Sequence, residues 1–521
     1  MNSSIGDEIH KASGDGVPFR ARPNHVHRTW ARTFSSLPEL YIQPESLAEI
    51  EKTVNLARKC RRRLVTVGSG HSPSNITCTS SWLVNLDNYN KILSLNAETG
   101  QVVMQSGIRL YMLNEVLERH GLAMPNLGSI NEQSIAGVIS TGTHGSSLQH
   151  GLVSESISSL KITLADGSTQ YCSAEENTEL FRGALLSLGA LGIITEVTFQ
   201  AVPAFKLRWD QVIDADSRVL ITWDTDLWTR GEYVRVWWLP HTRRAVIWQA
   251  NRTDDPETPP PTSYYGGILG YYIYHNLLYL GLWIPKVLPW VEWFVFGMQH
   301  GFHNGTHKSA VQQSRQALLM DCLYSQWVNE WALPLQKGKE FLRRFSTWLN
   351  KLPPSDPDYM EPNIPYSSDG LYIHSPVEVR VSDSRAKGAI RPYLDTSMAD
   401  SPTLYVNATL YRPYDIDPDY LFRYYAAFEH IMTELGGRPH WAKNFHTTAK
   451  DFEAFYGPDL EAWRRVRNSV DPDGMFAGPW HRKMILERNR PKLELEEELV
   501  EEQTQHRAGT LFVGRQVEEE L

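Results

Sequence analysis

The sequence predicts an α+β protein built from two domains. Its 521 residues are more than one hydrophobic core usually serves, so two or three domains are expected. Short strand-like and helical patterns alternate at close spacing up to Pro203, which is typical of an α/β or α+β domain. From Ala204 onward, segments rich in aromatic and β-branched residues indicate antiparallel strands. We therefore expect a first domain over 29–203 and a second, sheet-containing domain over 204–445.

Local patterns predict the elements of the first domain in chain order. Ser46 is placed to cap a helix that follows it, and the segment 64–72 reads as a buried strand that enters a glycine turn. The segment 111–121 reads as a helix that Gly121 closes. Residues 159–169 read as a strand that runs into an Asp-Gly turn, so a hairpin is expected there.

The second domain contains the most apolar stretch of the chain, 264–298, after a proline-rich loop. Its first part, 264–285, is about long enough to span a bilayer, and its many Tyr and Trp residues suit a membrane interface. Pro289 and Glu292 interrupt the remainder. The composition leaves two alternatives open, which are membrane association and a buried helical hairpin or apolar lid.

Composition and charge narrow the class of protein. The chain is 41% hydrophobic and 21% charged, as in folded globular proteins, and its net charge of -9 argues against a broad nucleic-acid-binding surface. The four cysteines are far apart and form no CxxC pair, so neither a disulfide framework nor a zinc site is predicted. The polar extension 1–28 has the character of neither a secretory signal nor a transit peptide. The charged segment 487–521 is expected to be a solvated tail.

Three glycine-rich segments lie within the first domain, at 67–72, 126–145 and 187–195. Glycines after a strand allow a tight turn whose backbone N–H groups can bind a pyrophosphate. The first segment, Val-Gly-Ser-Gly-His-Ser, is neither a Rossmann fingerprint nor a P-loop, and alone it is a weak signal. Three such segments together predict a dinucleotide that lies in an extended cleft.

Motifs in the second half of the chain complete a pattern. Residues 377–380 read Val-Glu-Val-Arg, 438–443 read Arg-Pro-His-Trp-Ala-Lys, and 471–476 read Asp-Pro-Asp-Gly-Met-Phe. With the glycine-rich segments, these motifs resemble the vanillyl-alcohol-oxidase-type FAD family. More closely, they resemble its sugar-1,4-lactone oxidases, above all the fungal D-arabinono-1,4-lactone branch. The resemblance extends from about Thr29 to Arg482.

The family resemblance implies a two-domain fold and a covalently bound cofactor. The expected domains are an FAD-binding domain over 29–203, a cap or substrate domain over 204–445 and a C-terminal segment of the oxidase core over 446–486. FAD would be attached through His71; the alternative is a turn histidine that only hydrogen-bonds a phosphate. No metal ligand is expected. The other residues expected to contact FAD are Val67, Gly68, Ser69, Gly70, Ser72, Gly128, Ser129, Ser134, Gly137, Thr141, Gly142, Thr143, His144, Gly192 and Ile194.

The catalytic candidates are Glu378, Arg380 and Lys443. Alternation along a strand places Glu378 and Arg380 on one face. A surface ion pair is the plain alternative for any Glu-x-Arg. The resemblance implies that these residues orient the substrate hydroxyls and that Lys443 stabilises charge beside the flavin. Ser129 and Thr409 are expected to contact the substrate as well.

The reaction that the resemblance implies is oxidation of an aldonolactone at carbon 2 by dioxygen, with release of hydrogen peroxide. Gly128 is expected to leave room for dioxygen, which favours an oxidase over a dehydrogenase. Rival hypotheses are an L-gulonolactone or alditol oxidase, and an inactive membrane-attached scaffold. A metallohydrolase that uses His71, His144 and His150 is a poorer alternative because no HExxH motif is present. The fungal relatives imply a mitochondrial membrane, with 264–298 as the anchor.

Overall fold

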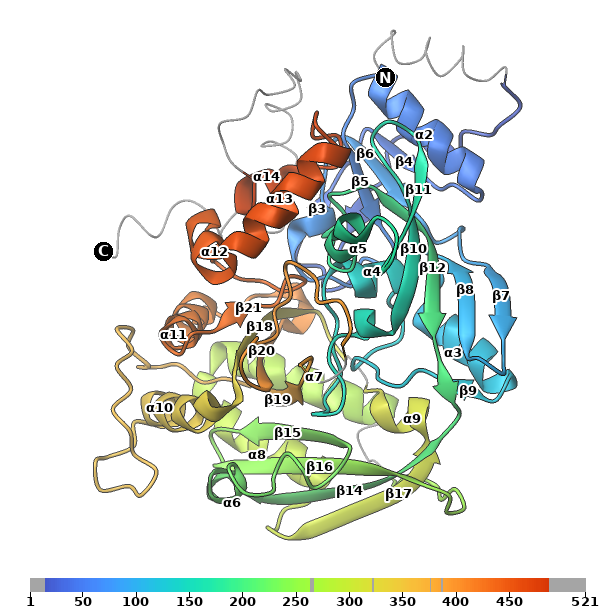
Figure 1. The fold of residues 1–521 in the computed structure, drawn as a ribbon. Coiled ribbons are helices and arrows are strands. Elements are labelled where there is room, and N and C mark those ends of the chain that lie inside the picture. Colours follow the sequence, from blue (N-terminus) through green and yellow to red (C-terminus); the bar gives the residue numbers. More distant parts are fainter. Residues whose placement is uncertain (1–14, 263–266, 321–322, 375, 386–387, 487–521) are drawn as a thin grey trace.

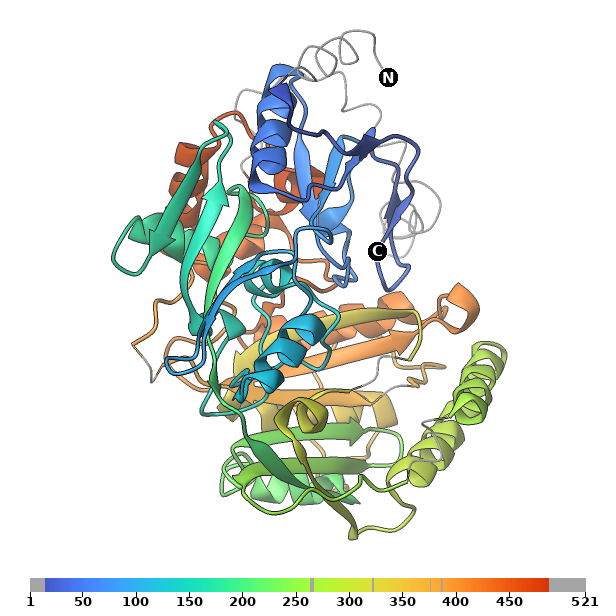
Figure 2. The same cartoon turned by 90° about the vertical axis from the view of Figure 1, so that its right-hand side faces the viewer.

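The computed structural model describes residues 15–262, 267–320, 323–374, 376–385 and 388–486. The predictions for the N-terminal 1–14 and for the tail 487–521 therefore lie outside the described residues. Figures 1 and 2 show two halves stacked one above the other. The upper half holds two small sheets and the lower half one large sheet, which together give the predicted α+β class.

The first sheet of the upper half begins the chain. Its strand order is β1 (Ala21–Arg22), β4 (Leu40–Ile42), β6 (Trp82–Asn85) and β5 (Leu64–Val67), and the last three run parallel. Strand β6 is buried along its whole length, as expected for a parallel strand covered on both faces. Ser46 accepts a hydrogen bond from the backbone N–H of Glu49 and begins helix α2 (Leu47–Lys59), as predicted.

The second sheet of the upper half is antiparallel. Its strand order is β11 (Thr169–Ser173), β10 (Ile157–Thr163), β12 (Ile193–Gln200), β8 (Gln101–Gln105) and β7 (Ile92–Asn96). The helices beside it are α3 (Leu110–Arg119), α4 (Ile135–Ser140) and α5 (Thr178–Ala184). Strands β10 and β11 form the hairpin predicted at the Asp-Gly turn, where Gly167 has φ +87°. Gly121, with φ +69°, follows α3 and confirms the predicted helix end.

Short elements connect these sheets. They are the strand pairs β2 (His27–Arg28) with β3 (Ser35–Ser36) and β9 (Leu122–Ala123) with β13 (Val202–Pro203), and the 3-10 turns η2 (Asn75–Thr77) and η3 (Val153–Ser156).

One eight-stranded antiparallel sheet forms the lower half. Its strand order is β17 (Thr306–Gln313), β14 (Lys206–Ala215), β16 (Arg244–Thr253), β15 (Tyr233–Leu239), β19 (Val377–Ser382), β20 (Thr403–Tyr411), β18 (Gln326–Pro334) and β21 (Arg438–Pro439). The predicted strands β15 and β16 are antiparallel neighbours. Strands that are distant in the chain are adjacent here, because β19 lies between β15 and β20.

The two faces of this large sheet have different roles. Helices α6 (Asp216–Thr222), α10 (Gly338–Asn350) and α11 (Leu421–Glu434) pack on one face over Val377, Val379 and Val381. Because side chains alternate along a strand, Glu378 and Arg380 point to the opposite face. That face meets the upper half (Figure 1). The short helix α9 (Ser314–Leu318) follows β17 at the edge.

The C-terminal helices return to the upper half. They are α12 (Ala449–Tyr456), α13 (Pro458–Val470) and α14 (Pro479–Met484), drawn in red in Figure 1. The backbone N–H of Leu64 donates to the carbonyl of Met475 at 2.9 Å, which joins this segment to β5. The upper half therefore contains residues from both ends of the described chain, and the residues between them form the lower half.

The apolar stretch is a helical hairpin. Helix α7 (Ile268–Trp283) and helix α8 (Leu288–His300) are joined by the 3-10 turn η4 (Pro285–Val287). Within the described part of the chain, no helix has both the length and the apolar character needed to cross a membrane. One side of the hairpin packs into the core through residues such as Tyr274 and Val295, while Ile268 is 79% exposed and Trp283 is 71% exposed. The apolar stretch is therefore a helical hairpin that is buried on one side only and leaves one apolar face uncovered.

Candidate active site

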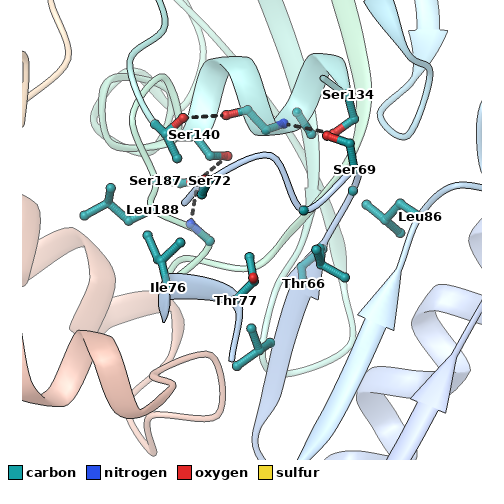
Figure 3. Close-up of a pocket in the computed structure, with 18 of the residues that line it drawn as sticks. Thr66, Ser69, Ser72, Ile76, Thr77, Leu86, Ser134, Ser140, Ser187 and Leu188 are labelled. Carbon is teal, nitrogen blue, oxygen red and sulfur yellow. Dashed lines mark hydrogen bonds between the residues drawn. The ribbon is translucent and has the colours of Figure 1, made fainter. Parts of the chain in front are cut away.

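A first cavity is lined by all three glycine-rich segments. The turn after β5, the first turns of α4 and the loop before β12 converge on it (Figure 3). Two hydrogen bonds hold this lining in place: Ser187 Oγ donates to Ser140 Oγ at 3.0 Å, and the backbone N–H of Gly189 donates to Ser187 Oγ at 3.1 Å. The cavity is therefore bounded by glycine and serine residues, whose backbone groups can face an extended ligand.

The glycines of this lining are required by close contacts. A Cβ atom on Gly68 would lie 2.1 Å from Ser134 Oγ, and one on Gly192 would lie 2.5 Å from the carbonyl oxygen of Thr163. Gly70 has φ +67°, which residues with a side chain rarely adopt. Larger residues at these positions would push the segments apart or fill the space between them.

His71 lies where the first cavity meets a second one, and it lines both. Its ring stacks on Trp30, with 5.1 Å between the ring centroids. Its Nδ1 atom is buried and has no hydrogen-bond partner among the described residues. Burial, together with the charges of Arg109 and Lys443, lowers the pKa of His71 to about 4. At neutral pH the imidazole is therefore uncharged and keeps a free lone pair.

The second cavity lies on the inner face of the large sheet. Alternate residues of β18, β19 and β20 line it, and the loop after β21 adds Lys443. From the first half come Gly128, Ser129, Thr143 and His144. The lining residues that carry formal charge at neutral pH are Glu330, Glu378, Arg380 and Lys443.

Glu330 pairs with both cations of this charged group. Its side chain is fully buried; Arg380 Nη2 donates to Oε1, and Lys443 Nζ lies 3.4 Å from Oε2. His144 Nε2 is 3.3 Å from Oε1, and Asn407 Nδ2 donates to Oε2 at 3.4 Å. Burial by itself raises the pKa of Glu330, but the two cations and His144 outweigh it and hold that pKa well below its ordinary range. Glu330 is therefore a permanent anion.

Glu378 and Arg380 form a second pair with Ser129. Arg380 Nε lies 3.5 Å from Glu378 Oε2, and Ser129 Oγ donates to Glu378 Oε1 at 3.5 Å. Arg380 Nη1 donates to Ser129 Oγ at 3.4 Å. Glu378 is thus held by long, replaceable contacts, which suits a carboxylate that must bind the hydroxyl group of a ligand.

Two buried histidines approach the same carboxylate. Ligand atoms of His144, Glu330 and His440 lie within 4.8 Å of one another, a spacing that could suit a metal ion. Arg380 and Lys443 already occupy the oxygens of Glu330, however, and two cations would repel a metal ion there. Burial lowers the pKa of His440 to about 3, so it is neutral. His150, which the metallohydrolase hypothesis invoked, instead lies 3.2 Å from Glu232 and lines neither cavity.

Sequence comparison decides the family. The family profile described as D-arabinono-1,4-lactone oxidase matches residues 197–484, which is more than half of the chain, and an FAD binding domain profile matches 38–173. The chain belongs to the D-arabinono-1,4-lactone oxidase family. A Neurospora crassa relative is 59% identical over 94% of this chain and 91% of its own length. The D-arabinono-1,4-lactone oxidases of Yarrowia lipolytica and Saccharomyces cerevisiae are 41% and 37% identical, over 90% and 88% of this chain and 98% and 96% of their own lengths.

Solved structures confirm the fold of this member of the D-arabinono-1,4-lactone oxidase family. Cholesterol oxidase from Brevibacterium sterolicum superimposes with a TM-score of 0.75 at 15% identity, over 91% of this chain and 99% of that one. The likeness confirms the predicted two-domain vanillyl-alcohol-oxidase-type fold. The FAD-binding profile covers strand β5 and the first two glycine-rich segments, which line the first cavity, so FAD is the cofactor that this cavity fits.

Most residues predicted for the lactone oxidase site do lie in the two cavities. Those in the first are Val67, Gly68, Ser69, Gly70, His71, Ser72, Ser134, Gly137, Thr141, Gly192 and Ile194. Those in the second include Gly128, Ser129, Thr143, His144, Glu378, Arg380, Thr409 and Lys443. Gly142 lines neither cavity, so the prediction that it contacts FAD is not supported. It has φ +71°, and a Cβ there would lie 3.0 Å from Leu186 Cδ1, so it serves the turn after α4.

Sequence reasoning missed Glu330, Asn407 and Trp30. Glu330 is a single acid within a strand rich in tryptophan, and a charged residue in a buried strand needs a partner. That pattern could have marked it as a site residue. Asn407 accepts a hydrogen bond from Thr409 Oγ1 at 2.8 Å. From the sequence, only the alternation of side chains along β20 could have placed it on the same face as Thr409.

Proposed function

We propose that this protein is a D-arabinono-1,4-lactone oxidase. It would oxidise carbon 2 of the lactone and pass the electrons to dioxygen, giving dehydro-D-arabinono-1,4-lactone (D-erythroascorbate) and hydrogen peroxide. The observation that carries the proposal is the position of the charged cavity, which adjoins the FAD cavity at His71. The names of relatives that align over nearly their full lengths support the choice of substrate.

The residues of the second cavity supply binding and proton transfer. FAD, when bound, accepts the hydride from carbon 2 and returns two electrons to dioxygen. Glu378 accepts the proton of the carbon 2 hydroxyl as the carbonyl forms, and Ser129 orients that hydroxyl. Arg380 and Lys443 balance the charge that develops beside the flavin. Asn407 and Thr409, which are joined by a hydrogen bond, offer polar groups for the remaining hydroxyls.

A substrate panel with peroxide detection tests this function. Purified protein is given D-arabinono-1,4-lactone, L-gulono-1,4-lactone and open-chain alditols, and the initial rates of peroxide formation are compared. We expect the highest kcat/KM with the arabinonolactone. A higher value with gulonolactone or with an alditol would replace the proposed substrate, and no turnover of any of them by yellow protein would favour the scaffold hypothesis.

We propose that FAD is bound covalently through His71. Three features support a nucleophilic role for this imidazole: it joins the two cavities, it is neutral, and its Nδ1 lone pair is buried without a partner among the described residues. An imidazole nitrogen in this state could bond to the electrophilic methyl carbon of the flavin ring; the methyl group and the imidazole would each lose one hydrogen, and dioxygen would take up both, with the two electrons, as hydrogen peroxide.

We propose that the hairpin α7–α8 attaches the protein to a membrane surface, and that this is a mitochondrial membrane. The support is an apolar face that the other described residues leave uncovered: Ile268, Leu269, Trp283 and Trp290 are 79%, 74%, 71% and 51% exposed. Tryptophan at such positions suits the headgroup region. Deletion of the hairpin would remove buried core residues, so substitution of the exposed ones is the better test.

Vesicle flotation measures this attachment directly. We expect Ile268→Ser/Leu269→Ser/Trp283→Ser to lose flotation with vesicles of mitochondrial lipid composition while keeping lactone oxidation. Ile221→Ser is the matched control, because Ile221 is 65% exposed on α6, outside the hairpin. Flotation that persists in the triple variant would contradict the proposal. Imaging of the wild-type and triple variants in fungal cells tests the organelle.

A further inference from the structure

The charged side chains that line the second cavity sum to zero. Arg380 and Lys443 are its cations, and Glu330 and Glu378 are its anions. The histidines that line it do not alter this balance, because burial lowers the pKa of His71 and His440 to about 4 and about 3 and lowers that of the fully buried His144 as well. A guanidinium and an ammonium that converge on one site would otherwise be a strong receptor for a carboxylate.

Glu330 occupies the place that such a carboxylate would take. Its two oxygens pair with the two different cations, one with Arg380 and the other with Lys443. Its side chain lines the cavity but has no exposed surface, so the two cations and their neighbours shield it from solvent. Asn407 donates a hydrogen bond to one of these oxygens, and His144 lies beside the other.

Lys443 depends on this anion. Among the described residues, Glu330 is its ion-pair partner, whereas Arg380 also contacts Glu378. Arg235, buried on β15, does not line the cavity, although it interacts electrostatically with Glu378 and Arg380. Without the charge of Glu330, the lining would therefore hold two cations and one anion, and it would attract anions.

We infer that Glu330 is a specificity-determining residue: its buried carboxylate neutralises Arg380 and Lys443, so the site accepts a neutral lactone and rejects the anionic aldonate that forms when the lactone ring hydrolyses. The inference rests on the proposed function for the identity of the lactone. A lactone and its aldonate carry nearly the same hydroxyl groups and differ by one unit of charge. Charge balance therefore offers a means of discrimination that does not depend on the hydroxyl groups that the two molecules share.

The isosteric variant Glu330→Gln tests this inference. Binding of sodium D-arabinonate is measured through the change in flavin absorbance, which requires no turnover. We expect the aldonate to bind the variant about tenfold more tightly or better, since one buried charge has been removed. The KM for the lactone should not fall in the same way. A purely structural role would weaken both ligands, so equal or weaker aldonate binding would overturn the inference.

Two further variants sharpen the test. Glu292→Gln removes a buried carboxyl group from α8, outside the cavity, and should leave both affinities unchanged. Adding Lys443→Met to Glu330→Gln removes one cation again, and aldonate affinity should return toward the wild-type value.

If Glu330→Gln does not fold, the wild-type protein still tests the inference, because aldonate that binds as tightly as the lactone contradicts it. Absence of lactone turnover in the wild type would instead refute the proposed function, and the aldonate titration would still report on the charge balance.

Discussion

Lys443 Nζ lies 3.4 Å from Glu330 Oε2, which joins the loop after the edge strand β21 to the adjacent strand β18. The same carboxylate also pairs with Arg380 on β19, two strands away across the sheet. One buried anion on β18 therefore orders two cations beside the cofactor cavity, one from β19 and one from the loop after β21.

Glu378→Gln should slow flavin reduction by lactone by about 100-fold or more, because the amide cannot accept the hydroxyl proton. The pairing of Arg380 with Glu330 is left intact, so the fold should survive. Stopped-flow absorbance of the flavin under anaerobic conditions gives the rate. Glu232→Gln, whose carboxylate pairs with His150 and Arg252 away from the cavities, is the control. A wild-type rate in Glu378→Gln would remove Glu378 from the proposed role.

His71→Ala should release the flavin from the polypeptide. After acid precipitation, wild-type pellets are expected to stay yellow, while the variant leaves its flavin in the supernatant. His120→Ala alters an exposed histidine at the end of α3 and should behave like the wild type. Yellow His71→Ala pellets would show that the link, if one exists, is made elsewhere.

Gly68→Ala should lower flavin content, because the added Cβ would lie 2.1 Å from Ser134 Oγ and 2.8 Å from its Cβ. Such overpacking usually costs about 1–3 kcal/mol. Ser134→Gly removes the colliding atoms. Replacing this N-cap serine by glycine costs only about a few tenths of a kcal/mol. The double variant should therefore regain flavin, as measured by the ratio of 450 nm to 280 nm absorbance. No recovery would mean that Gly68 matters for another reason.

Gly128→Ala should slow the reaction with dioxygen by about tenfold or more, equivalent to ~1.4 kcal/mol of barrier. The new methyl group would lie 3.1 Å from Thr143 Cγ2, so a small shift of Thr143 can accommodate it. Reduction of an artificial dye by the lactone should continue, which shows that folding and substrate oxidation survive. Peroxide formation at the wild-type rate would exclude Gly128 as a determinant of dioxygen access.

Glu292→Gln should make stability less dependent on pH. Burial raises the pKa of Glu292 from 4.5 to about 7, although hydrogen bonds from Thr242 oppose the shift. Because the folded-state pKa is raised, the stability from this group is fully present below about pH 4.5 and is lost as pH rises through about 7. The glutamine variant cannot ionise, so its melting temperature should rise relative to wild type between pH 5 and pH 8. A constant difference across that range would contradict this account.

Local sequence determined much of the cofactor site. Local sequence predicts the strand before His71, the cap at Ser46 and the glycines of three segments. Each of these features depends on residues that are close in the chain. Strand alternation likewise placed Glu378 and Arg380 on one face. The apolar stretch 264–298 was recognised, but its composition fits a spanning helix and a packed hairpin equally well.

Tertiary structure decided what depends on strand order. Glu330, Asn407 and Lys443 meet because β18 lies between β20 and β21, and nothing local to any of these strands specifies that register. Gly142 likewise packs against Leu186 from a distant segment, a contact that its local sequence does not specify. Sequence by itself determined the chemical groups, whereas the long-range pairing of strands decided which of them share a cavity. Such pairing follows from packing of the whole sheet and not from local propensity.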